Sequence, residues 1–181
     1  MLTGMTYTIL EDDLSGEPTR ALIAWHLAQM RANTPEGHVF ALDDAGLTAP
    51  GVALWTAWRD DRLAGMAALK QLDHESAELK SMRTHPEFLR QGVASALLRY
   101  IVAEARRRGL NRLSLETGRG EAFEPALVLY RHWGFTPGAP FGDYVASEFN
   151  QFFHLNLGSP ETPEPGSEVP MIYRKRLRSG Q

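Results

Sequence analysis

The sequence contains no cysteine among its 181 residues. This absence excludes a disulfide framework, a thiolate metal site and a cysteine nucleophile. It is compatible with a reducing compartment, and we expect the protein to be cytoplasmic. The six histidines are scattered without the spacing of metal ligands, so we expect no metal.

The sequence also lacks a strong excess of charge and any long apolar run. Its formal net charge of −3 gives no electrostatic footprint for nucleic acid, so we expect no such partner. No stretch approaches the roughly 18–20 apolar residues of a membrane span. Residues 1–10 lack the basic and apolar regions of a signal peptide, so we expect no contact with a membrane.

Hydrophobic periodicity predicts alternating strands and helices in one domain. We expect helices beginning at Glu17 and spanning Val93–Arg108 and Pro125–Trp133, and strands at Tyr7–Leu10, Val52–Trp58, Leu63–Leu72, Ser76–Thr84, Arg112–Glu116 and Phe152–Leu157. The strand–helix–strand order around Val93–Arg108 implies a parallel, right-handed unit, whereas a meander precedes it. The predicted fold class is therefore α/β (α+β), with a mixed sheet between layers of helices.

The composition changes after Leu157. Residues 158–167 are rich in proline and glutamate, which is typical of a flexible or extended linker. Met171–Arg178 is short, basic and partly apolar, and fits either an added strand or a disordered tail. We expect a single domain over residues 1–157, followed by this linker and tail over residues 158–181.

The segment from Leu89 to Ser95 has the features of an anion site. A strand ends before it, a loop turns tightly, and a helix begins at Gly92–Val93–Ala94. Free backbone N–H groups and the positive end of the helix dipole converge at such a point. The small residues Gly92 and Ala94 would let a diphosphate approach the backbone. The alternative is an ordinary turn in which glycine serves only geometry.

This segment resembles motif A of the GNAT superfamily of N-acetyltransferases, Gln/Arg-x-x-Gly-x-Gly/Ala. Gly92 and Ala94 occupy the last two fixed positions, whereas Leu89 replaces the usual arginine or glutamine. The family contacts the pyrophosphate of its cosubstrate, acetyl-CoA, mainly through backbone N–H groups, and Arg90 adds a nearby positive charge. The resemblance therefore implies the following cofactor-binding residues: Leu89, Arg90, Gln91, Gly92, Val93, Ala94 and Ser95.

A second block, Ala126–Phe135, resembles the family pattern Ala-x-x-Leu-Tyr-x-x-x-Gly-Phe. The resemblance spans residues 53–157 and implies a mostly antiparallel sheet with one parallel, splayed strand pair. It makes Tyr130 the general acid that protonates the departing coenzyme A thiolate; the alternative is a half-buried core tyrosine. Phe123 stands where the family often has an asparagine that contacts the pantetheine arm.

The strand Ser76–Thr84 carries further candidates. By resemblance, the main chain of Met82, Arg83 and Thr84 grips the pantetheine and the acetyl carbonyl. Strict alternation places two groups of side chains on opposite faces, namely Glu78, Lys80 and Met82 against Leu79, Ser81 and Arg83.

Two carboxylates compete for the role of general base. Glu78 lies where several family members carry a catalytic glutamate, and its alternative is an ion pair with Lys80 on a solvated face. Glu116 ends the parallel strand, where ligands of such sheets usually bind. Asp143 lies in a loop expected near the acceptor, either to hold a cationic substrate or to stabilise a turn.

We therefore expect an acetyl-CoA-dependent N-acetyltransferase that acts on a primary amine of a small molecule. Two alternatives stay open: an acyl-CoA-binding module without catalysis, suggested by Leu89 and Phe123, and N-acetylation of proteins or peptides. The acceptor and the oligomeric state are undetermined, and a homodimer is compatible with the sequence. Loops that vary freely on one scaffold set such specificity.

Overall fold

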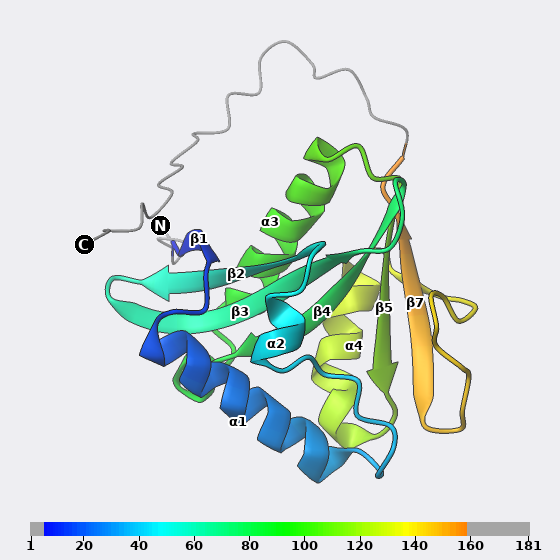
Figure 1. Ribbon diagram of the computed structural model, residues 1–181, viewed down its shortest axis with the longest axis horizontal. Coiled ribbons are helices and arrows are strands. Elements are labelled where there is room, and N and C mark those ends of the chain that lie inside the picture. Colours follow the sequence, from blue (N-terminus) through cyan, green and yellow to red (C-terminus); the bar gives the residue numbers. More distant parts are fainter. Residues whose placement is uncertain (1–5, 159–181) are drawn as a thin grey trace.

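The computed structural model describes residues 6–158, in which a twisted sheet forms the central layer (Figure 1). Its order is β1-β2-β3-β4-β5-β7-β6. The strands are β1 (Thr8–Asp12), β2 (Val52–Arg59), β3 (Arg62–Gln71), β4 (Ser76–Thr84), β5 (Arg112–Gly118), β6 (Thr136–Pro137) and β7 (Asn150–Asn156). Only the pairing of β4 with β5 is parallel within this described region. The predicted mixed, mostly antiparallel fold is confirmed.

Helices cover both faces of the sheet (Figure 1). The helices α1 (Glu17–Asn33) and α2 (Asp44–Leu47) lie on one face, where Ile23 and Leu47 pack with Met66 of β3. The helices α3 (Val93–Arg107) and α4 (Glu124–His132) lie on the other, where Ile101 and Leu127 belong to the larger core. The sheet thus separates two apolar cores, as expected for a three-layer domain.

The bounds of all the predicted helices and strands agree with the structure to within two residues. Periodicity missed the short elements, namely α2, β6 and the 3₁₀ turns η1 (Pro86–Phe88) and η2 (Glu121–Phe123). These elements have two to four residues each, too few to repeat a hydrophobic pattern. The predicted tail, including Met171–Arg178, lies outside the described residues, so the domain boundary stays a prediction.

The two parallel strands separate halfway along their length. β4 pairs with β5 only over Ser76–Glu78 and Arg112–Ser114. Beyond that point β4 stays bonded to β3 and β5 to β7, with Glu116 opposite Phe152. The main-chain groups that face the gap are consequently released from the ladder, which is the splayed pair that the family resemblance implied.

A bulge in β4 changes which side chains share a face. Lys80 lies opposite Ala68 and Arg83 opposite Met66, so β4 has one extra residue there, and Ser81 adopts a positive φ of 51°. Such a bulge interrupts strict alternation. The predicted grouping of Met82 with Glu78 and of Arg83 with Leu79 is therefore wrong. The side chain of Met82 meets α4, whereas that of Arg83 meets α1.

A close approach at Gly65 of β3 places the start of α3 against the sheet. A Cβ atom at this position would lie 2.7 Å from Cγ1 of Val93 and 2.9 Å from the carbonyl oxygen of Arg83. Contacts this short do not occur for real side chains, so glycine is required. Gly65 thereby sets the distance between the first turn of α3 and the bulged end of β4.

Candidate active site

The N-terminus of α3 presents free backbone donors. Its N-cap, Gly92, has a φ of 80°, and the first intrahelical hydrogen bond runs from the Ala96 N–H to the Gly92 carbonyl. The N–H groups of Val93, Ala94 and Ser95 therefore have no hydrogen-bond acceptor within the helix. The first turn holds no acidic residue, and a Cβ at Gly92 would meet nothing within 4 Å. The helix start is thus open to an anion and electrostatically suited to it.

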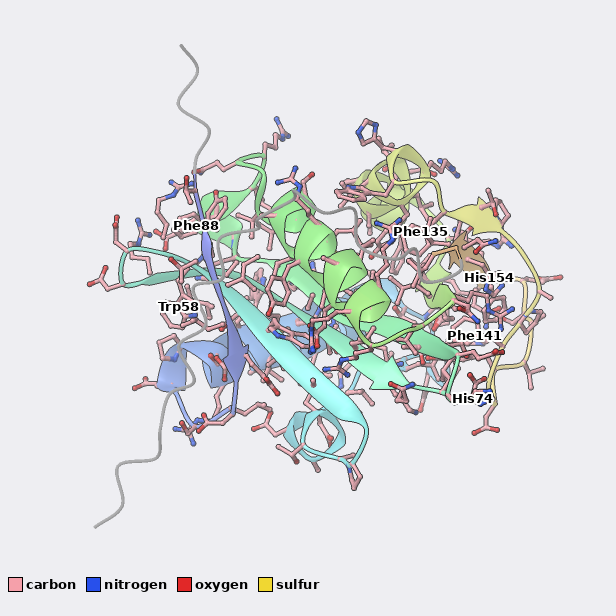
Figure 2. The ribbon with its side chains drawn as sticks, turned by 90° about the horizontal axis from the view of Figure 1, so that it is seen from above. Trp58, His74, Phe88, Phe135, Phe141 and His154 are labelled. Carbon is pink, nitrogen blue, oxygen red and sulfur yellow. The ribbon has the colours of Figure 1, made fainter. Side chains whose placement is uncertain are left out.

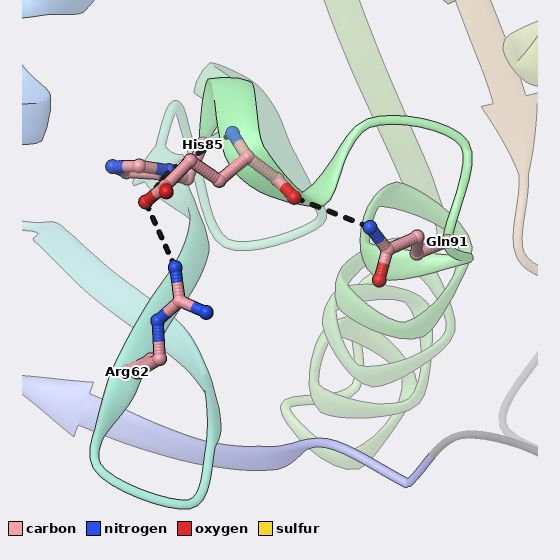
Figure 3. Close-up of polar contacts among 4 residues, drawn as sticks. Arg62, His85 and Gln91 are labelled. Atoms are coloured by element: carbon pink, nitrogen blue, oxygen red, sulfur yellow. Dashed lines mark hydrogen bonds and ion pairs between the residues drawn. The ribbon is translucent and has the colours of Figure 1, made fainter.

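Polar contacts hold the loop before α3 in place (Figure 3). The carboxylate of Glu87 pairs with Arg62 at 2.9 Å, and its carbonyl accepts a hydrogen bond from the Gln91 side chain. The carbonyl of Gln91 accepts another from Tyr7. Leu89 is 59% exposed, so its departure from the family pattern leaves an apolar side chain in solvent. The loop and the start of α3 together contain all seven cofactor-binding residues predicted from Leu89 to Ser95.

A cavity of about 170 Å³ opens where β4 and β5 separate. Its walls are the diverging strands, α1 with the segment after it, and the start of α4. The predicted residues at the cavity are Glu78, Met82, Arg83, Glu116 and Tyr130. Phe123 also lines it and packs against Phe149. Asp143 is exposed and does not line the cavity, so the structure does not bring it to the other candidates.

Glu78 is buried at the closed end of this cavity. Its Oε1 atom accepts hydrogen bonds from the Tyr144 hydroxyl at 2.5 Å and from Nζ of Lys80 at 3.1 Å. Lys80 also donates to the Tyr144 hydroxyl at 2.6 Å. The ion pair anticipated between Glu78 and Lys80 is present, but its side chains are only 3% and 8% exposed, so the expectation of a solvated face is wrong.

Glu116 lies across the gap and has the acid–base properties of a base. Burial raises the pKa of Glu116 to about 7; the positive charge of Lys80 opposes this shift, and the negative charge of Glu78 adds to it. A general base works best when its pKa lies near the working pH. Glu116 thus exchanges protons in the neutral range.

Tyr130 approaches the gap from α4, on the opposite side of the sheet from α1. Its hydroxyl lies 3.8 Å from the sulfur of Met82, and the residue is 8% exposed. Burial raises the pKa of Tyr130 to about 12, and the positive charge of Arg83 moderates this rise. The phenol is therefore protonated at neutral pH and can donate a hydrogen bond into the gap.

Sequence reasoning missed His26 as a site residue. Its Nδ1 accepts a hydrogen bond from Nε of Arg83 at 2.9 Å. Burial and, to a lesser extent, the positive charge of Arg83 lower the pKa of His26 to about 3. The imidazole is consequently neutral and orients the guanidinium. Its position on a buried helical face gave no signal of this role.

Sequence reasoning also missed Tyr144, which lies in the loop 138–149. Figure 2 shows Phe141 and His154 at the β7 side of the molecule, where their rings lie 5.7 Å apart. His154 bonds Ser114 on the sheet and the carbonyl of Ala139 in the loop, both at 2.8 Å. Phe141 in turn contacts the Tyr144 ring. The anchored loop therefore directs Tyr144, rather than Asp143, to Glu78 and Lys80 in the cavity wall.

Residues 6–158 lack two features, a cluster of metal-binding side chains and a membrane-spanning helix. No group of three or more histidine, aspartate or glutamate side chains in that range is placed to hold a metal ion. No helix in the same part of the chain is long and apolar enough to cross a membrane.

The fold resembles solved acetyltransferases. An aminoglycoside 6′-N-acetyltransferase complexed with coenzyme A superimposes with a TM-score of 0.65, covering 87% of this chain and 99% of the other. Only 13% of the aligned residues are identical, so this likeness concerns the fold.

Sequence relatives are much closer. The chain is 44% identical over 151 residues to the uncharacterized N-acetyltransferase YedL of Escherichia coli K12, which covers 83% of this chain and 95% of the relative. It is 46% identical over 133 residues to the uncharacterized N-acetyltransferase YsnE of Bacillus subtilis 168, covering 74% and 88%. The acetyltransferase (GNAT) family profile matches residues 19–135. The chain therefore belongs to the GNAT family of acetyltransferases.

Proposed function

We propose that this protein transfers the acetyl group of acetyl-CoA to a primary amine of a small molecule. The observation that carries the proposal is the gap between β4 and β5, which has donor and acceptor groups on opposite sides. The open α3 N-terminus and Tyr130 lie on one side, and Glu116 lines the cavity on the other. A thioester bound in this gap would have its carbonyl next to an amine bound in the middle of the gap.

The binding of acetyl-CoA is assigned to main-chain groups. The N–H groups of Val93, Ala94 and Ser95 would hold the pyrophosphate, with Arg90 nearby. The unpaired edge of β4 at Met82 and Thr84 would hold the pantetheine and polarise the acetyl carbonyl, because β5 no longer covers it. Leu89 and Phe123 do not weaken this assignment, since neither position has to supply a side-chain hydrogen bond.

The side chains divide the remaining chemistry. Glu116, ionised at and above neutral pH, would accept the proton of the substrate ammonium and leave a neutral amine. The amine nitrogen then attacks the thioester carbonyl, a C–N bond forms, and the C–S bond breaks. Tyr130 would donate a hydrogen bond to the departing thiolate, which takes the proton that the newly acylated nitrogen loses, while Glu116 returns its own proton to solvent. Glu78, already bound by Tyr144 and Lys80, would orient Lys80 and raise the pKa of Glu116.

The cavity favours a small acceptor over a polypeptide. Its volume of about 170 Å³ is bounded on the acceptor side by α1 and by Thr34, His38 and Phe40 of the following segment. A peptide would need an extended groove for its flanking residues. The structural neighbour complexed with coenzyme A is named for an aminoglycoside, which is also a small-molecule amine.

Release of free thiol from acetyl-CoA tests this function. The wild-type protein is mixed with a panel of small amines and, separately, with short peptides, and product formation is followed by mass spectrometry. Acetylated small amines support the proposal. Acetyl-CoA binding without turnover of any amine would show a binding module instead, and turnover confined to peptides would show a peptide acetyltransferase.

A further inference from the structure

Arg83 is a half-buried cation without an anionic partner among residues 6–158. It lines the acceptor cavity, and its Nε donates to the neutral ring of His26. None of the ion pairs in this part of the chain includes Arg83, and its two terminal nitrogens have no protein acceptor there. Burial lowers the pKa of Arg83, as expected for a cation that has lost water without gaining a carboxylate.

Two hydroxyl groups on the wall of the same cavity are also unsatisfied. Ser81 and Thr34 line the same cavity, each is 9% exposed, and neither side-chain oxygen has a hydrogen-bond partner among the described residues. An unsatisfied buried hydroxyl costs about 1–3 kcal/mol. Two such groups in the same cavity as an unpaired guanidinium are typical of a site that a polar ligand completes.

The charges of the cavity wall have a definite pattern. Glu78 and Lys80 neutralise one another, which leaves Glu116 and Arg83 as one acidic and one basic group. Part of the wall is apolar, formed by Met30, Phe40, Phe123, Ala126 and Phe149, and the polar side chains of Gln29, Asn33 and Thr117 line it as well. The cavity therefore complements a molecule that has an amine, a second group of negative charge and an apolar part.

We propose that the acceptor is a free amino acid with an apolar side chain, whose amine faces Glu116 and whose carboxylate is bound by Arg83. This inference rests on the proposed acetyl transfer and specifies its substrate class. The planar guanidinium binds a carboxylate through two parallel hydrogen bonds, and His26 fixes the plane of the guanidinium by accepting from Nε. Ser81 and Thr34 add donors for the same carboxylate.

A different role for Arg83 makes a different prediction. Its charge also acts on Tyr130, so Arg83 could stabilise the departing thiolate instead of the acceptor. In that case every acceptor would lose the same factor in kcat when Arg83 is changed. A carboxylate-binding Arg83 affects only acceptors that have a carboxylate, mainly through KM.

The experiment compares leucine, methionine and phenylalanine with their carboxamides, which keep the shape but lack the negative charge. Wild type, Arg83→Gln, Arg83→Lys and the exposed control Arg99→Gln are assayed by thiol release, with rates corrected for the fraction of free amine. We expect wild type to prefer the best acid over its amide by roughly 10- to 150-fold in kcat/KM, the range of one charge-assisted interaction. Arg83→Gln removes this preference, Arg83→Lys restores part of it, and Arg99→Gln retains it.

Binding supplies a readout independent of turnover. Calorimetry with protein saturated by coenzyme A should detect the same amino acids with wild type and not with Arg83→Gln, while the affinity for coenzyme A stays unchanged. Equal use of acids and amides, or an equal loss for both in Arg83→Gln, overturns the inference while leaving acetyl transfer intact. Failure of every amino acid to bind overturns it as well, whereas binding without any acetylation contradicts the proposed function alone.

Discussion

The Tyr144 hydroxyl donates a 2.5 Å hydrogen bond to Glu78, although 66 residues separate the two along the chain. Burial and the adjacent negative charge of Glu78 raise the pKa of Tyr144, so this phenol stays protonated and remains a donor. Lys80 donates to the same carboxylate oxygen. The charge of Glu78 and its Oε1 atom are therefore committed to its neighbours, which favours Glu116 as the group that exchanges protons with the substrate.

Replacing Glu116 should change the pH dependence of catalysis. With a pKa of about 7, wild-type kcat should rise as pH increases through neutrality and then level off, because only the ionised carboxylate accepts a proton. Glu116→Gln should lose about 10²–10⁴-fold in kcat and lack this inflection. Initial rates at saturating substrate between pH 5.5 and about 9 measure both effects. Glu17→Gln, a change on the exposed start of α1, is the control, and an unaltered inflection in Glu116→Gln would assign the base elsewhere.

The same substitution should alter the pH dependence of stability without any substrate. Folding raises the pKa of Glu116 from 4.5 to about 7, so the folded protein holds a proton that the unfolded chain releases. This contribution to stability is fully present below pH 4.5 and is lost as the pH rises through 7. The Tm of Glu116→Gln minus the Tm of wild type should therefore be larger at pH 8 than at pH 4.5. Tm differences that are equal at both pH values would contradict the raised pKa.

Much of the fold followed from local pattern. The stripe of α3 and the alternation in the early part of β4 extend over several periods, so tertiary contacts reinforce the local preference and the predicted bounds are accurate. The turn at Gly92 was equally recognisable, because its positive φ requires glycine whatever surrounds it.

Other features depend on tertiary structure and had no local signal. The extra residue at Ser81 changes the side on which Arg83 lies, but serine is not distinctive of a bulge. Tyr144 and Asp143 are adjacent in sequence, and only the anchoring of their loop determines which one contacts Glu78. The neutral state of His26 arises from burial beneath the fold, which a helical spacing of apolar residues cannot distinguish from ordinary core packing.

A change at Gly92 should abolish binding of acetyl-CoA. Gly92→Asp places a negative charge in front of the N–H groups that would hold the pyrophosphate, although a Cβ there meets no neighbour within 4 Å. Acetyl-CoA at about 100 times its Kd should stabilise wild type by roughly 2.7 kcal/mol, and this stabilisation should vanish in the variant. Chemical denaturation with and without ligand measures the difference.

Gly109 provides a matched control for this experiment. It also has a positive φ, of 75°, and open space around its Cβ position, but it lies beyond the opposite end of α3. Gly109→Asp therefore incurs a similar backbone strain far from the proposed pyrophosphate site and should keep the ligand-dependent stabilisation. A folded Gly92→Asp protein with wild-type affinity for acetyl-CoA would contradict the assignment of the cofactor site.

Removing the Tyr130 hydroxyl should slow departure of the thiolate. A phenol with a pKa near 12 is a much weaker acid than a thiol, whose ordinary pKa is about 8.5, so full proton transfer to sulfur is unfavourable in the ligand-free site. A hydrogen bond to the developing charge is still worth about 1.5–3 kcal/mol, or roughly 10- to 150-fold in rate.

Tyr130→Phe tests this donor because it retains the ring and its contact with Phe135 in the core. Among residues 6–158 the wild-type hydroxyl has only the weak acceptor sulfur of Met82 as a partner, so its removal should change the Tm little. Single-turnover kinetics, which isolate the chemical step from product release, should show the loss in rate with an unchanged affinity for acetyl-CoA. A single-turnover rate within about twofold of wild type would mean that water or another side chain stabilises the thiolate, and that Tyr130 serves only to fill the core.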